Sequence, residues 1–122
     1  MTRFRITKPA QDDIDDILAT SLDTFGEQAK QRYDQLILTA IREVVSQPTG
    51  IGRKPRPELG HDVYQYYLTS SRDRVQPPKM RVKQPRHYLI YRLEDDGNPI
   101  AFGRVLHDRA LPAHYLNADT WN

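Results

Sequence analysis

The stretch HYLIYRLEDDGNPIAFGRVL, residues 87–106, has the clearest strand pattern in this chain. Its two ends, residues 87–93 and 100–106, are rich in the aromatic and β-branched side chains that favour strands. Between them, residues 95–98 read Asp-Asp-Gly-Asn, a composition typical of a tight turn. The stretch therefore predicts a β-hairpin of two antiparallel strands.

The predicted hairpin is apolar on both of its faces. Side chains alternate along a strand, so Leu89 and Tyr91 point to one side of the pleat while Tyr88 and Ile90 point to the other. A sheet built around this hairpin must be covered on two sides to keep these residues from water.

The segments before the hairpin predict a strand and two helices. Residues 3–7 alternate between polar and apolar side chains, as in a half-buried strand. Pro9 suits the first turn of a helix, and Gly26 breaks that helix. Residues 27–46 keep apolar side chains at helical spacing and predict a second helix. Because few residues separate the two helices, we expect them to pack as an antiparallel hairpin.

The order of these elements predicts an α+β fold. A strand over residues 63–69 precedes the β-hairpin, so the chain reads as a strand, a helical hairpin and a three-stranded antiparallel meander in two layers. Its length of 122 residues suits one domain over residues 1–122. Since two helices cover only one face of a sheet, we expect Tyr88 and Ile90 on the other face to lie exposed and to bind a second chain.

Composition excludes several classes of site. The chain has no cysteine, which rules out disulfides, thiolate metal sites and a cysteine nucleophile. Its four histidines have no metal-site spacing, and no glycine-rich phosphate loop is present, so we expect neither a metal nor a cofactor. No apolar run reaches the roughly 18 residues of a membrane helix, and no signal peptide is recognisable, so we expect a cytoplasmic protein without a membrane partner.

Basic side chains are concentrated in residues 72–86, which we call the basic segment. Six of them face a single acidic residue, Asp73. This density suits an anionic partner, either a nucleic acid or an acidic protein segment, and a solvated loop is the alternative interpretation. The six are Arg72, Arg74, Lys79, Arg81, Lys83 and Arg86.

A second candidate site lies at the end of the last predicted strand, where the chain reads Arg-Val-Leu-His-Asp-Arg over residues 104–109. An imidazole between two guanidinium groups can donate a proton and stabilise phosphate charge, as RNA cleavage requires. The alternative is structural: Arg104 and Arg109 pair with carboxylates, and His107 closes the strand.

Taken together, these segments resemble the ParE branch of the RelE/ParE toxins of type II toxin–antitoxin systems. The resemblance covers most of the chain. It rests on the order and spacing of short motifs: the strand and Pro-initiated helix of residues 6–14, the Phe25-Gly26 break, Ala29 and Tyr33 in the second helix, residues 88–92, and residues 104–109.

This resemblance implies a cytoplasmic bacterial toxin that a cognate ParD-like antitoxin neutralises and that inhibits DNA gyrase without being an enzyme. Antitoxin binding is then expected at Tyr88 and Ile90, on the second face of the sheet. Target binding is expected at Arg72, Arg74, Arg81, Lys83, Arg86, Arg104 and Arg109.

The RelE relatives imply an alternative function, a ribosome-dependent endoribonuclease that cuts mRNA. In that case His107 is the general acid or base, and Arg92, Arg104 and Arg109 hold phosphate. The chain departs from compact family members in its long connection over residues 70–85, and in lacking an acidic residue shortly after Arg109. A binding module without toxicity is a third possibility.

Overall fold

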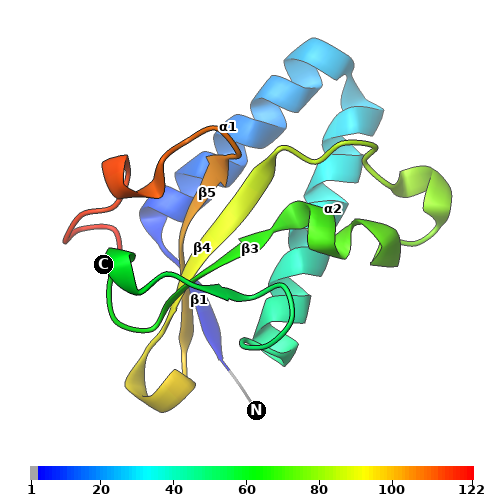
Figure 1. The fold of residues 1–122 in the computed structure, drawn as a ribbon. Coiled ribbons are helices and arrows are strands. Elements are labelled where there is room, and N and C mark those ends of the chain that lie inside the picture. The colour runs from blue at the N-terminus through cyan, green and yellow to red at the C-terminus, as the bar shows by residue number, and fades with distance from the viewer. Residues whose placement is uncertain (1–2) are drawn as a thin grey trace.

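The hairpin predicted at residues 87–106 forms the centre of the sheet (Figure 1). In this computed structural model, which describes residues 3–122, β4 (His87–Leu93) pairs antiparallel with β5 (Ile100–His107). The register shifts between Ile90 and Tyr91: Ile90 lies opposite Arg104, but Tyr91 lies opposite Phe102. Gly103 is therefore the extra residue of a β-bulge.

Three further strands complete a mixed sheet of order β1-β5-β4-β3-β2. Strand β3 (Val63–Tyr67) pairs antiparallel with β4, which confirms the predicted meander. Strand β1 (Phe4–Ile6) lies parallel to β5, and the two-residue strand β2 (Lys54–Pro55) pairs antiparallel with β3 at the opposite edge. The expected strand over residues 63–69 ends earlier, at Tyr67, because a 3-10 helix begins at Leu68.

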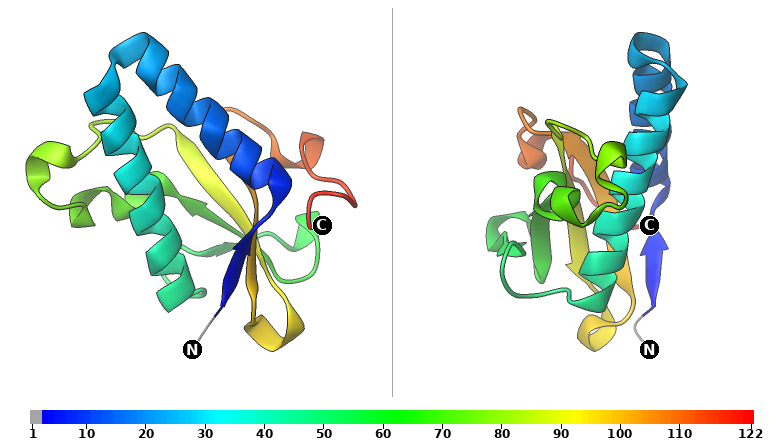
Figure 2. Two further views of the ribbon diagram at one scale, coloured as in Figure 1. Left: turned by 180° about the vertical axis from the view of Figure 1, so that it is seen from behind. Right: turned by 90° about the vertical axis from the view of Figure 1, so that its right-hand side faces the viewer.

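Both predicted helices are present and lie against one face of the sheet (Figure 2). Helix α1 (Lys8–Phe25) is capped by the Thr7 side chain, which accepts a hydrogen bond from the backbone N–H of Ala10. Gly26, at a φ of 94°, turns the chain into α2 (Glu27–Ser46). The core between helices and sheet contains Leu36, Ile37, Ala40, Ile41, Val44, Leu89, Tyr91, Phe102 and Val105.

The expectation that the second face of the sheet is bare is wrong. Tyr88 and Ile90 are 1% and 0% exposed and form a second buried cluster with Val63 and Leu106. The cover comes from the chain itself, because Leu59, Ala110, Leu116 and Trp121 pack against this cluster. Figure 1 shows the C-terminal segment, in red, beside the short 3-10 helix Pro57–Leu59, in green. Tyr88 and Ile90 are consequently not available to a partner in this structure.

Trp121 holds residues 113–122, which we call the tail, against the sheet. Its ring lies over the bulge residue Gly103, where a Cβ atom would come within 2.6 Å of a ring carbon. The guanidinium of Arg92 lies 4.6 Å from the ring centroid, a cation–π contact. Arg5 donates to the backbone carbonyl of Trp121 and pairs with Glu94 at 2.9 Å. No helix within residues 3–122 is long and apolar enough to cross a membrane.

Candidate functional site: a groove with a basic rim

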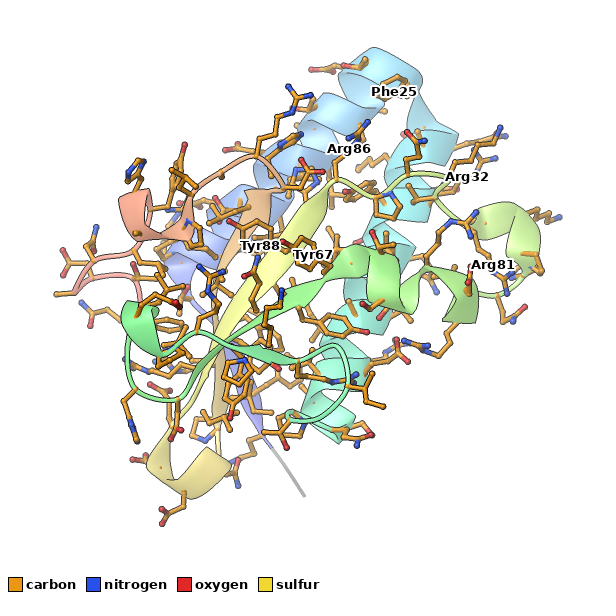
Figure 3. The ribbon with its side chains drawn as sticks, in the orientation of Figure 1. Phe25, Arg32, Tyr67, Arg81, Arg86 and Tyr88 are labelled. Atoms are coloured by element: carbon orange, nitrogen blue, oxygen red, sulfur yellow. The ribbon has the colours of Figure 1, made fainter. Side chains whose placement is uncertain are left out.

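A groove of about 970 Å³ opens between the helical hairpin and the basic segment. Its apolar lining includes Ile17, Phe25, Ala29 and Val82. Figure 3 shows labelled rim residues on both sides, Arg32 on α2 and Arg81 and Arg86 on the basic segment. Within residues 3–122, six basic side chains and two histidines, His87 and His107, line it beside one acidic residue, Asp16; the six are Arg32, Arg72, Lys79, Arg81, Lys83 and Arg86.

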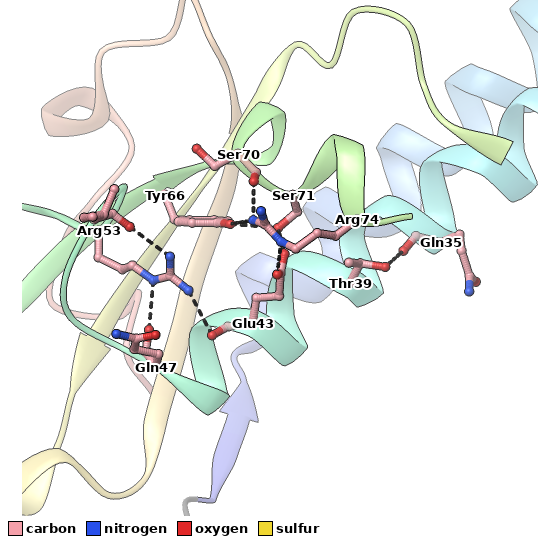
Figure 4. A network of polar contacts seen from close by, with 10 residues as sticks. Gln35, Thr39, Glu43, Gln47, Arg53, Tyr66, Ser70, Ser71 and Arg74 are labelled. Carbon is pink, nitrogen blue, oxygen red and sulfur yellow. Dashed lines mark hydrogen bonds and ion pairs between the residues drawn. The ribbon is translucent and has the colours of Figure 1, made fainter. Parts of the chain in front are cut away.

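A polar network fixes the start of the basic segment to α2 (Figure 4). The carboxylate of Glu43 accepts from the hydroxyl of Ser71 and pairs with Arg74. The hydrogen bond that Arg74 donates to Glu43 raises the pKa of Arg74 above its usual value. Buried Ser71 also lies 2.8 Å from the hydroxyl of Tyr66, and Arg53 covers the Tyr66 ring at 4.8 Å. These contacts therefore hold the start of the basic segment beside α2.

Three arginines of the basic segment bind other residues of the same chain. Arg72 Nε donates to the carbonyl of Val82 at 2.6 Å, and Arg81 Nε donates to that of Val75 at 2.9 Å. These two bonds cross-link the two arms of the segment, while Arg74 joins it to α2. The charges of Arg72 and Arg74 are paired with Asp73 and Glu43, which argues against a primary role of these two in binding a target, whereas Arg81 has no ion pair within residues 3–122.

The remaining cations of the segment are free to meet a partner. Lys79 and Lys83 are exposed and have no hydrogen bond or ion pair within residues 3–122. Arg86 makes only a loose pair with Asp108, at 3.7 Å. The predicted target-binding set therefore separates into structural arginines and a free group, to which Lys79 should be added.

Two histidines and a tyrosine form one end of the groove. His87 and His107 are cross-strand neighbours on β4 and β5, with ring centroids 5.4 Å apart and the rings edge-to-face. The hydroxyl of Tyr33 on α2 lies 2.6 Å from Nδ1 of His87. Burial and the neighbouring His107 lower the pKa of His87 to about 4. His87 is therefore uncharged at neutral pH.

The residues of the alternative nuclease interpretation are brought together only in part: the backbone N–H of Arg109 donates to Nδ1 of His107 at 3.2 Å, whereas the side chains of Arg92 and Arg104 have other partners. Arg104 is bound by Asp13 of α1 through two hydrogen bonds, of 2.7 and 2.8 Å, and the same carboxylate accepts from the backbone of Val105. Arg92 lies under Trp121. Of the four predicted residues, His107 lines the groove, whereas Arg92, Arg104 and Arg109 do not.

Sequence reasoning missed the contribution of α2 and of the tail. The sequence placed Tyr33 in the second helix, where it contributes to the family resemblance, and His87 at the start of a predicted strand, but it predicted no functional role for either. The signal that could have joined them is the register of the hairpin, which places His87 opposite His107. Within residues 3–122, no three His, Asp or Glu side chains gather as metal ligands.

Comparison with known protein families supports the resemblance seen in the sequence. Residues 4–112 match the family described as ParE toxin of type II toxin-antitoxin system, parDE. The match spans both helices and all five strands, and it ends before the tail. No curated protein is similar enough to the chain to count as a match.

Proposed function

Because the chain belongs to the ParE toxin family of type II toxin–antitoxin systems, we propose that it acts on DNA gyrase and that a ParD-like antitoxin neutralises it by occupying the groove. The observation that supports this most directly is the groove itself, which is apolar inside and basic at its rim. We further propose that residues 1–122 work as one domain in the cytoplasm, where gyrase acts on DNA.

The groove suits an amphipathic protein segment with acidic side chains. Its apolar residues Ile17, Phe25 and Val82 can pack against one face of such a segment, as in other helix-in-groove complexes. Free cations at the rim, Lys83 and Arg86 among them, attract acidic side chains on its flanks. An antitoxin segment bound there would also cover the cations that we assign to the target.

The free group of Lys79, Lys83 and Arg86 is the part of the surface best suited to gyrase or to the DNA that it holds. These side chains project from a segment that the Glu43 network holds in place. Cations without internal partners can exchange their water for an anionic partner without breaking an existing ion pair. Arg109, on the loop after β5, is exposed and can extend this surface.

A gyrase assay with supercoiled plasmid tests the target. The purified protein is expected to inhibit supercoiling and to trap cleaved DNA, and the double variant Lys79→Ala/Lys83→Ala to do so at least about tenfold less well. Arg42→Ala/Lys54→Ala, which removes two exposed cations outside the basic segment, is the matched control. Unchanged supercoiling with no trapped cleavage complex would reject gyrase as the target.

The nuclease function is the less well supported alternative, because Arg104 is satisfied by Asp13 and Arg92 lies under the tail. Mapping the 5′ ends of mRNA after induction separates the two functions. We expect no new cuts at codons, and equal toxicity for His107→Ala. Codon-specific cuts that disappear in that variant would support a nuclease, and induction without any effect on growth would support a non-toxic binding module.

A further inference from the structure

Hydrogen bonds at Tyr33 favour one tautomer of His87. The backbone N–H of Arg86 donates to the Tyr33 hydroxyl at 3.1 Å, so this oxygen is an acceptor there. The Tyr33 proton is then directed to its other close neighbour, Nδ1 of His87, at 2.6 Å. When Nδ1 accepts the Tyr33 proton, Nε2 carries the proton of the neutral His87 ring.

His107 also presents a protonated Nε2. Its Nδ1 accepts from the backbone N–H of Arg109 at 3.2 Å, which places the proton of the neutral ring on Nε2. When the ring is charged, Nδ1 pairs with Asp108 at 3.1 Å and Nε2 remains protonated. His107 therefore offers an Nε2–H donor when its Nδ1 accepts from Arg109 and also when the ring is charged.

The two Nε2 donors belong to residues that line the groove. Both rings line the groove, and neither Nε2 has a hydrogen-bond partner in the described part of the chain, residues 3–122. Arg86 beside them holds Asp108 only loosely. Further along the same groove, Nε of Arg32 is buried and has no partner among the same residues. The buried Nε of Arg32 thus lacks an acceptor in that part of the chain, and the histidine rings line the same groove, where an acceptor from a partner can reach them in place of water.

We propose that this end of the groove is a carboxylate-binding pocket, in which the Nε2–H groups of His87 and His107 and the guanidinium of Arg86 hold an acidic side chain of the antitoxin. The assignment rests on the proposed function for the identity of the partner, but the pocket itself is defined by the donors. It makes the two histidines specificity-determining residues, with no catalytic role.

The surrounding charges favour a carboxylate over a phosphate. The acidic groups that face the histidines are Asp108 after β5 and Asp13 on α1, with Asp16 in the groove lining. The basic side chain that lines the groove next to the two histidines is Arg86. A phosphate of nearly two negative charges is repelled by the nearby carboxylates more strongly than a singly charged carboxylate. The apolar lining beside the pocket also suits a peptide side chain.

NMR of the purified protein with isotope-labelled histidine tests the pocket without an antitoxin. Long-range proton–nitrogen spectra report the tautomer of each ring, and acetate and inorganic phosphate serve as probes. We expect Nε2–H in both His87 and His107, with Nε2 shifts that saturate as acetate is added. The exposed His61 and His114 lie outside the groove and are internal references. A proton on Nδ1 of His87, or acetate shifts no larger than those of the references, would overturn the proposal.

Variants at the rim sharpen the test. Arg86→Gln is expected to weaken acetate binding at least about tenfold through the loss of a charge-assisted hydrogen bond. His107→Gln keeps a side-chain N–H and should retain binding, whereas His107→Leu should lose it. Phosphate binding about tenfold tighter than acetate would assign the pocket to a nucleic acid and overturn the carboxylate. The gyrase assay is independent of these probes, so failure of the pocket and failure of the proposed function are distinguishable.

Discussion

At the scale of single residues, Gly103 and Trp121 depend on each other. A Cβ atom at position 103 would lie 2.6 Å from the Trp121 ring, so Gly103→Ala must displace the ring or strain the bulge. We expect a loss of about 1–3 kcal/mol in the free energy of unfolding, measured with urea. In a Trp121→Ala background the same change should cost little, because nothing remains to clash. An equal cost in both backgrounds would show that the backbone, not the ring, requires glycine.

His87 should make stability depend on pH. Its pKa of about 4 in the folded protein lies below the ordinary value of 6.5, so the unfolded chain takes up the proton first as pH falls. The stability that the folded protein has with an uncharged His87 is complete above pH 6.5 and is lost progressively as the pH falls to about 4. We expect a loss of up to about 2 kcal/mol after allowance for solvent screening. Thermal melts of wild type and His87→Gln should converge at low pH, and identical profiles throughout would contradict the lowered pKa.

The sequence correctly predicted the face of the sheet on which each strand side chain lies, but it did not predict which residues those side chains contact. The alternation along residues 87–93 correctly placed Leu89 and Tyr91 on one face and Tyr88 and Ile90 on the other. It could not show that Leu116 and Trp121 return to cover the second face, because two apolar residues in an irregular tail have no periodicity to read. Likewise, charge density could not separate Arg72 and Arg81, which bind backbone carbonyls, from the free Lys83.

At the scale of elements, Glu43 of α2 determines where the basic segment leaves the sheet. Glu43→Gln removes the charge that holds Arg74 and weakens the bond from buried Ser71. We expect the variant to lose about 1–3 kcal/mol of stability, and trypsin to cut the basic segment faster than in wild type. Glu58→Gln, which breaks an exposed pair with Arg56, is the control and should leave both measurements near wild type. Unchanged cleavage in Glu43→Gln would show that the segment is positioned by other contacts.

Regular elements were predictable because their patterns are long. Both helices, the strands of the meander and the first strand were recognisable from periodicity, with ends shifted by a few residues. Strand β2 was not, because two residues that include Pro55 carry no alternation. The parallel pairing of β1 with β5 also escaped prediction, since it joins segments almost a hundred residues apart.

For the molecule as a whole, the tail covers the face of the sheet that is opposite the helices. Removal of residues 113–122 leaves the region that matches the ParE family but uncovers Tyr88 and Ile90. We expect the truncated chain to be less stable by about 3–5 kcal/mol and to bind a fluorescent dye for exposed apolar surface. Full stability and no dye binding would mean that Leu59 and Ala110 cover the face without help.

The hydrogen bond from Arg5 to the backbone carbonyl of Trp121 affects how the protein folds. This contact closes a loop between residues 116 positions apart, and the β1–β5 pairing is almost as remote in sequence. The helical hairpin, by contrast, forms from contacts between neighbours in sequence. Contacts between residues far apart in sequence form slowly because closing the large loop between them costs conformational entropy. The helical hairpin should therefore gain protection from hydrogen exchange early in refolding, and the Trp121 environment should report the last phase.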